Sequence, residues 1–311
     1  MNDVIIISGP TAVGKSELAL KLAKILNTEI ISADSMQIYR YMDIGTAKVS
    51  QHELNEIKHN LINIKNPDEN YSVQEFQNDA LEIITNLHNQ NKIPIVVGGT
   101  GLYIDSLTHN FDFVNVKPDY ELREKLENLY NKDPETILNM VKEINFEHYK
   151  ELGIKDKKKL IRAIEVFKKS NKLIDYSRKN NNKNINYHLF VLTDDREDLY
   201  NRINKRVDLM IKKGLLNEVE NLLANKNVSK KSQSMKAIGY KEVISYLDKE
   251  ISYEEMINQL KQNSRRYAKR QLTWFRRNEL SKWIDISKYT KDEIIDIILK
   301  NLEWLLLKMK C

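Results

Sequence analysis

The chain has 311 residues, of which 41% are hydrophobic, which is enough for one large domain or a domain with an insertion. Its 50 lysines and arginines outnumber its 44 aspartates and glutamates, an excess that suits either a phosphate-rich partner or an ordinary lysine-rich protein. The single cysteine, Cys311, excludes an intrachain disulfide framework and favours a reducing compartment. Because no apolar run approaches the ~20 residues of a membrane span, and no secretory leader is visible, we expect a cytoplasmic protein without a membrane partner.

The first elements alternate between strands and helices. Residues 4–8 form a β-branched run typical of a buried parallel strand, and residues 15–26 place apolar side chains at helical spacing. The same patterns predict a helix at residues 73–91 and further strands at residues 29–35, 92–99 and 187–195. This alternation predicts an α/β fold, a parallel sheet of the phosphate-loop type flanked by helices, with its ligand beyond the carboxyl ends of the strands.

Strand patterns disappear in the middle of the chain. Between about Lys117 and Asn186 the sequence is rich in lysine and asparagine, has helical stretches, and ends in a loop-like segment at residues 177–187. We therefore predict a core of residues 1–116 and 187–311 and an all-helical insertion of residues 117–186. After Asp195 we expect helices to the end, apart from loops near residues 225–235 and 280–288.

A phosphate-binding pattern, G-x-x-x-x-G-K-[ST], lies between the first predicted strand and helix. Its glycines let backbone N–H groups surround an anion, and the helix N-terminus adds partial positive charge. Lys15 can reach a terminal phosphate, and the Ser16 hydroxyl can bind Mg²⁺. The predicted phosphate-binding site consists of Gly9, Pro10, Thr11, Ala12, Val13, Gly14, Lys15 and Ser16.

The pattern does not identify the ligand as ATP. The predicted strand of residues 92–99 ends in glycine, where a motor-type NTPase has an aspartate for magnesium. Asp34 lies at the tip of the strand of residues 29–35, where a carboxylate can accept a proton or hold magnesium. Both roles suit group transfer from a phosphorylated donor, and a small-molecule kinase that uses ATP would need the same residues.

Five segments in order resemble the tRNA dimethylallyltransferase family, over residues 4 to about 285. They read GPTAVGKS, ADSMQIYRYMDIGTAK, PIVVGGTGLY, KAIGYKE and RRYAKRQLTWFR. The resemblance implies transfer of a dimethylallyl group from dimethylallyl diphosphate to N6 of the adenosine at tRNA position 37, just 3′ of the anticodon. The phosphate loop would then hold the diphosphate that leaves as pyrophosphate, with a P-loop small-molecule kinase as the alternative.

The resemblance also implies residue roles. Asp34 would be the general base, Thr100 a substrate contact at the reacting centre, and Arg206 a neighbour of the diphosphate. Lys159 and Lys236 stand where the family more often has arginine, so they keep the charge but lose bidentate geometry. The implied tRNA contacts are Asp34, Ser35, Met36, Gln37, Thr100, Arg123, Lys158, Lys159, Leu160, Ile161, Arg162, Lys236, Ala237, Ile238, Gly239, Tyr240 and Lys241.

The last basic segment, residues 265–277, predicts a helix with distinct faces. One face carries Arg266, Arg270 and Arg277, which either contact RNA phosphates or are solvated. Another carries Tyr267, Gln271 and Trp274, and core packing is the better interpretation for its two aromatic residues. The resemblance implies that the chain binds the anticodon stem-loop of tRNA, dimethylallyl diphosphate and Mg²⁺, and we expect a monomer.

Overall fold

The structure is a computed structural model that describes residues 2–109, 114, 116, 118–147, 150, 156–173, 184–224, 226 and 228–302. The chain separates into two compact units, one of residues 1–108 and 182–311 and one of residues 109–181. The second unit thus begins and ends earlier than the insertion placed at residues 117–186. Lys117, Cys311 and most of the loop expected at residues 177–187 lie outside the described residues.

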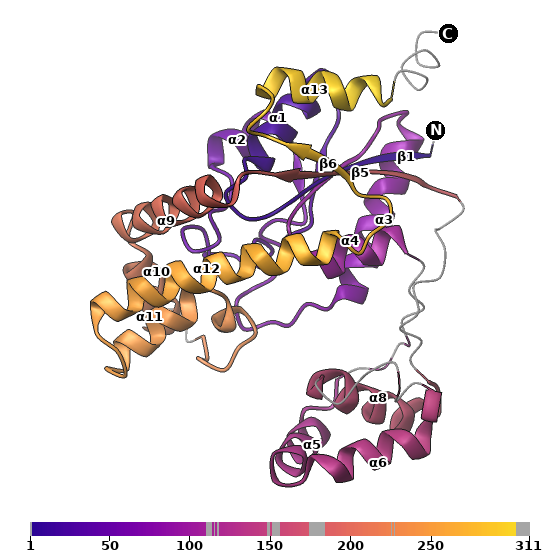
Figure 1. The fold of residues 1–311 in the computed structure, drawn as a ribbon, viewed down its shortest axis with the longest axis vertical. Helices are drawn as coiled ribbons and strands as arrows, with labels where there is room; N and C mark the ends of the chain where they lie inside the picture. Colours follow the sequence, from indigo (N-terminus) through magenta and orange to yellow (C-terminus); the bar gives the residue numbers. More distant parts are fainter. Residues whose placement is uncertain are drawn as a thin grey trace. The chain divides into compact units, whose positions relative to one another are not determined.

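The larger unit is built on a six-stranded parallel sheet of order β3-β2-β4-β1-β5-β6 (Figure 1). All six residues of the central strand β1 are buried, because helices cover both faces of the sheet. The predicted parallel sheet flanked by helices is confirmed. The strands are β1 (Asp3–Ser8), β2 (Ile30–Ser32), β3 (His59–Asn60), β4 (Ile95–Val97), β5 (Asn186–Thr193) and β6 (Lys282–Asp285).

Both edge strands escaped the sequence analysis. Strand β6 pairs in parallel with β5 inside the segment expected to be a loop at residues 280–288, so that expectation was wrong. Only Ile284 among its four residues is buried, which leaves too little apolar pattern to mark a strand. Strand β3 has two residues, and no periodicity can show over that length.

Alternate residues of the strands face two helical layers. Ile5 and Ile7 pack in one apolar cluster with α1 (Lys15–Ile25) and α13 (Lys291–Lys300). Val4 and Ile6 belong to the cluster on the opposite face. That cluster draws on α3 (Val73–Asn89), α4 (Gly101–Thr108), α10 (Leu215–Ala224), α11 (Tyr240–Leu247) and α12 (Tyr253–Phe275).

Helix α9 (Arg196–Lys212) contributes Leu199 and Ile203 to the first cluster and Val207 to the second. The remaining helices of this unit are the short α2 (Gln51–Glu56) and the 3₁₀ turn η1 (Ser234–Lys236). None of the described helices combines the length and the apolar character needed to cross a bilayer.

The smaller unit packs three described helices, α5 (Tyr120–Lys132), α6 (Pro134–Ile144) and α8 (Lys157–Ser170). They enclose an apolar cluster of their own, which includes Leu126, Ile137 and Ile164. Asp119, Asp133 and Asp156 accept hydrogen bonds from first-turn N–H groups at the three N-termini.

The two-layer packing predicts unequal costs for truncations within helix α1. Leu22 is fully buried, so Leu22→Ala should lower the free energy of unfolding by about 2–5 kcal/mol, through lost apolar burial and the cavity left behind. Ile25 on the same helix is 57% exposed, so Ile25→Ala should cost less than about 1 kcal/mol. Urea unfolding of both variants checks this, and equal losses would contradict the assigned layers.

Candidate active site

The loop of residues 9–16 joins β1 to α1 with three residues at positive φ. These are Gly9 at 137°, Ala12 at 67° and Gly14 at 91°. A Cβ at Gly9 would lie 2.4 Å from the carbonyl oxygen of Leu192, so only glycine fits there. Gly14 starts α1 without a side-chain cap, which leaves the first-turn N–H groups of the helix to serve an anion in the loop.

Lys15 folds back over this loop. Its Nζ atom donates to the carbonyl oxygens of Gly9 at 3.1 Å and Pro10 at 2.7 Å. Burial, with a smaller contribution from the positive charge of Arg206, lowers the pKa of the Lys15 ammonium to about 7, although the charge of Asp34 partly opposes both causes. An anion bound in the loop would stabilise the charged form of this lysine.

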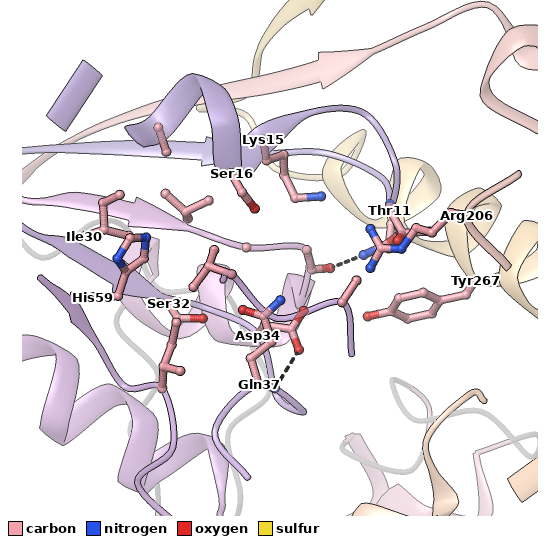
Figure 2. Close-up of a pocket in the computed structure, with 18 residues that line it drawn as sticks. Thr11, Lys15, Ser16, Ile30, Ser32, Asp34, Gln37, His59, Arg206 and Tyr267 are labelled. Carbon is pink, nitrogen blue, oxygen red and sulfur yellow. Dashed lines mark hydrogen bonds between the residues drawn. The ribbon is translucent and has the colours of Figure 1, made fainter. Parts of the chain in front are cut away.

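One pocket gathers residues from distant parts of the chain beyond the carboxyl ends of the strands (Figure 2). Six predicted site residues line it together, namely Thr11, Lys15, Ser16, Asp34, Gln37 and Arg206. Its other polar lining residues include Ser32, His59, Tyr267 and Gln271.

Asp34 follows β2 and caps the turn after it. Its Oδ1 atom accepts hydrogen bonds from the backbone N–H of Met36 at 2.9 Å and of Gln37 at 3.3 Å. These bonds fix the carboxylate, while its Oδ2 atom has no hydrogen-bond partner within the described residues. Asp34 can therefore accept a proton from a substrate without breaking its own turn.

Thr100 connects the segment after β2 with helix α12. Its Oγ1 atom accepts from the backbone N–H of Ser35 at 3.1 Å, and its hydroxyl lies 3.4 Å from the Ser35 Oγ atom. The Thr100 side chain also acts to lower the pKa of the Tyr267 hydroxyl, so the two side chains are neighbours. The segment that follows β4 can lie this close to the segment that follows β2 because residue 98 is glycine, since a Cβ there would lie 2.1 Å from the carbonyl oxygen of Ala33. Thr100 thus borders the site, although it is not among the residues that line the pocket itself.

Helix α12 supplies two pocket residues that the sequence analysis missed. Gln271 Oε1 accepts from the backbone N–H of Thr11 at 3.0 Å, and its Nε2 donates to the carbonyl oxygen of Gly99 at 2.8 Å. Burial raises the pKa of Tyr267 to about 12, with the charge of Asp34 as a further cause, so its hydroxyl stays protonated at neutral pH. The expectation of core packing was wrong for Tyr267, which lines the pocket.

Trp274, on the same face, does pack inside the unit. Its Nε1 atom donates to Asp105 Oδ2 at 2.8 Å, and a Cβ at Gly101 would lie 2.3 Å from its ring. Gln271 is the one amide side chain between the aromatic residues of this face. It was the feature of the sequence that could have indicated that part of the face contacts the site and not the apolar core.

Arg206 approaches the pocket from α9. Its Nη2 atom donates to the carbonyl oxygen of Thr46 at 3.4 Å. Burial lowers the pKa of its guanidinium, whereas the negative charge of Asp34 raises it. Arg206 and Asp34 therefore interact electrostatically across the pocket. Lys15 and Arg206 therefore present two cations to one ligand.

A divalent cation fits this site only with help from a ligand. The described residues hold no group of three His, Cys, Asp or Glu side chains that could bind a metal by itself. The exposed hydroxyl of Ser16 and the oxygens of a bound diphosphate form the donor set that Mg²⁺ commonly accepts in phosphate sites.

The predicted RNA-contact segments include buried side chains. Leu160 and Ile161 belong to the apolar cluster of the smaller unit, and Tyr240 is fully buried in the larger one. Ala237 and Gly239 are buried as well. A contact of Leu160, Ile161, Ala237, Gly239 or Tyr240 with RNA would therefore involve the backbone, and these implied contacts stay predictions. Lys158, Lys159, Lys236 and Lys241 are exposed, and Ile238 is half-buried.

Two arginines of the smaller unit hold one buried carboxylate. Arg123 Nη2 and Nε lie 2.8 Å and 2.9 Å from the two oxygens of Glu165, and Arg162 Nη1 also donates to Glu165. The side chain of Glu165 is fully buried, so this cluster supports the fold of the unit. Both arginines remain partly exposed, at 33% and 27% of the side chain, and their RNA contact stays a prediction.

The arginine face of α12 is open to solvent. Arg266 and Arg270 are exposed on this helix, Arg277 is exposed just beyond its end at Phe275, and the Arg270 guanidinium lies 5.6 Å from the centre of the Tyr267 ring. Contact of these arginines with RNA stays a prediction.

The lowered pKa of Lys15 predicts a pH-dependent anion affinity. Below pH 7 the ammonium is present before binding, whereas above pH 7 an anion must draw a proton to it. The ratio of pyrophosphate affinities of wild type and Lys15→Met, measured by calorimetry without metal, should fall by up to about tenfold per pH unit above 7. The variant corrects for the ionisation of pyrophosphate itself, and a ratio that stays constant from pH 6 to 9 would contradict the assignment.

Comparisons with known proteins agree on one family. Residues 37–278 match the family model described as IPP transferase. A tRNA dimethylallyltransferase of Acetivibrio thermocellus is 47% identical over 310 residues, which cover 98% of each chain.

Solved structures agree as well. The full-length tRNA isopentenylpyrophosphate transferase from Bacillus halodurans is 38% identical with a TM-score of 0.73, and 100% of each chain is covered. A tRNA delta(2)-isopentenylpyrophosphate transferase from Staphylococcus epidermidis is 38% identical with a TM-score of 0.71, covering 97% of this chain and 99% of its own. A eukaryotic dimethylallyltransferase acting on tRNA is 28% identical with a TM-score of 0.76, covering 92% of this chain and 74% of its own. The resemblance seen in the motifs is confirmed: the chain belongs to the IPP transferase family.

Proposed function

We propose that this chain transfers a dimethylallyl group from dimethylallyl diphosphate to N6 of the adenosine at tRNA position 37, 3′ of the anticodon. The observation that carries the proposal is the pocket in which Asp34 faces Lys15 and Arg206 (Figure 2). A base for an amine and two cations for a diphosphate are the groups that this reaction requires. The names of the relatives support the same chemistry.

The cations act on the leaving group. As the allylic C–O bond breaks, negative charge grows on the departing pyrophosphate. Lys15, Arg206 and the N–H groups of the loop and of α1 would stabilise that charge. Mg²⁺, held by the Ser16 hydroxyl and the diphosphate oxygens, would add further charge neutralisation when bound.

The carboxylate acts on the nucleophile. The N6 amine of adenine is weakly nucleophilic, because its lone pair is delocalised into the ring. As the new C–N bond forms, Asp34 accepts one N6 proton, and Oδ2 is the oxygen that its own turn does not use. Thr100 and Tyr267 border the reacting centre beside Asp34 and would orient the adenine.

The RNA must present an unstacked adenine to this pocket, which costs a few kcal/mol. Contacts of Ser35, Met36 and Gln37 with the flipped nucleotide, and of the exposed Lys158, Lys159, Lys236 and Lys241 with the anticodon stem-loop, would offset that cost. A small-molecule kinase, the alternative left open by the phosphate loop, is not favoured by the named relatives.

Donor choice separates the two functions. Purified protein with unmodified tRNA, Mg²⁺ and labelled dimethylallyl diphosphate should transfer label to tRNA without ATP, because the bond that breaks already carries its diphosphate leaving group. Nuclease digestion and mass spectrometry of the tRNA identify the labelled nucleoside. No label in tRNA, together with ATP-dependent phosphorylation of a metabolite, would contradict the proposal.

The role of Asp34 as general base predicts that its replacement lowers turnover but not tRNA affinity. Asp34→Asn keeps the shape of the side chain but removes its basicity, so kcat for prenyl transfer should fall by about 10²–10⁴-fold. The affinity for tRNA, measured by filter binding, should stay within about threefold. The matched control is Asp292→Asn, whose side chain is 83% exposed, and which should behave as wild type. Full turnover by Asp34→Asn would exclude Asp34 as the base.

A further inference from the structure

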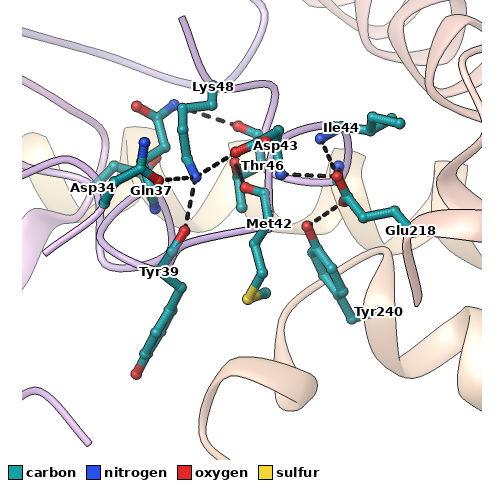
Figure 3. A network of polar contacts seen from close by, with 12 residues as sticks. Asp34, Gln37, Tyr39, Met42, Asp43, Ile44, Thr46, Lys48, Glu218 and Tyr240 are labelled. Carbon is teal, nitrogen blue, oxygen red and sulfur yellow. Dashed lines mark hydrogen bonds and ion pairs between the residues drawn. The ribbon is translucent and has the colours of Figure 1, made fainter. Parts of the chain in front are cut away.

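A single carboxylate from α10 enters the loop of residues 42–48, which follows the Asp34 segment (Figure 3). Glu218 Oε2 accepts from the backbone N–H of Asp43 at 2.8 Å and of Ile44 at 2.7 Å, and its Oε1 accepts from that of Gly45 at 3.0 Å. Three successive N–H groups that converge on one anion form a strong and directional arrangement. Glu218 therefore fixes the backbone of this loop.

Tyr240 completes the arrangement from α11. Its hydroxyl donates to Glu218 Oε1 at 2.6 Å, and its side chain is fully buried. Burial and the charge of Glu218 raise the pKa of Tyr240 well above its ordinary value, so the hydroxyl remains a donor. A Cβ at Gly45 would lie 2.5 Å from the Tyr240 ring, so glycine is needed for the loop to lie against the ring.

The residue after this anchored turn reaches the site. The carbonyl oxygen of Thr46 accepts from Gln37 Nε2 at 3.3 Å and from Arg206 Nη2 at 3.4 Å. Both donors line the pocket, whereas Glu218 and Tyr240 do not. The Thr46 hydroxyl donates to the carbonyl oxygen of Met42 at 2.6 Å, which closes the turn on itself.

The loop also has a second, independent attachment. Lys48 Nζ donates to the carbonyl oxygen of Tyr39 at 2.7 Å and lies 2.6 Å from Asp43 Oδ1, with its side chain 2% exposed. Lys48 therefore supports the fold of the loop, and loss of the Glu218 contacts should shift the turn of residues 43–46 without unfolding the unit.

We infer that Glu218, together with Tyr240, is a positioning residue for the reaction, and this inference rests on the proposed function. Glu218 holds residues 43–45 so that the Thr46 carbonyl keeps Arg206 and Gln37 at the pocket. The KAIGYK segment, which resembles a tRNA-contact segment, thereby has an internal role at Tyr240. Because small displacements of charge-stabilising groups strongly affect a transition state, the role should appear in kcat.

The test is a double-mutant cycle between Glu218 and Arg206, measured as prenyl transfer to tRNA. Glu218→Gln lacks one acceptor oxygen and the negative charge, and it should lower kcat about 10–100-fold, with the KM values for tRNA and donor within about threefold of wild type. In an Arg206→Gln background, the same change should cost less than about threefold, because its effect passes through Arg206. A purely structural role would give the same factor in both backgrounds.

Two further variants and one physical readout sharpen the test. Glu220→Gln, on the exposed side of the same helix, should leave kcat unchanged. Tyr240→Phe keeps the buried ring and removes one hydrogen bond, so it should lower kcat about 3–10-fold, and it serves as the second variant if Glu218→Gln does not fold. Hydrogen exchange at the amides of residues 43–45 should accelerate in Glu218→Gln and not in Glu220→Gln.

The outcomes are distinguishable. Suppose that wild type transfers the prenyl group. If Glu218→Gln and Tyr240→Phe both keep the wild-type kcat, or if Glu218→Gln lowers kcat by the same factor with and without Arg206→Gln, the positioning role is overturned and the proposed function stands. If wild type transfers no prenyl group, the proposed function fails, and the positioning role falls with it.

Discussion

Asp34 shares a pocket with Lys15 and Arg206, yet it forms an ion pair with neither. Each charged group is instead held by the backbone: Lys15 by the carbonyls of its own loop, Arg206 by the Thr46 carbonyl, and Asp34 by two N–H groups of its turn. The charges are therefore fixed apart and stay available for a substrate. A direct ion pair would have to break before these groups could act on a substrate, and breaking a buried ion pair is costly.

This separation depends on close backbone packing at the carboxyl ends of the strands. Gly9 meets the Leu192 carbonyl, and Gly98 meets the Ala33 carbonyl, at distances that exclude any side chain. Gln271 then links the phosphate loop to the segment after β4 through two hydrogen bonds. The same sheet edge thus brings together the anion loop, the general base and the residues of α12, although they are distant in the sequence.

The sequence predicted the parts of this arrangement that local patterns encode. The phosphate loop, the central strands and the helix at residues 73–91 follow from glycine spacing, β-branched runs and helical periodicity, and α3 also begins with a capping box of Ser72 and Glu75. The two edge strands were missed, since each has at most one buried residue. Tyr267 was assigned to the core, because helical spacing identifies a face and not what that face meets. Glu218 gave no signal at all, since its partners are backbone N–H groups that lie 173 to 175 residues away in the sequence.

The central claim is that the phosphate loop holds the diphosphate of the prenyl donor while Asp34 separately serves the RNA amine. Product inhibition by pyrophosphate measures this most directly. The account predicts that pyrophosphate competes with dimethylallyl diphosphate, that it does not compete with tRNA at fixed saturating donor, and that Lys15→Met weakens the inhibition. Competition with tRNA alone, or inhibition that is unchanged in Lys15→Met, would contradict it.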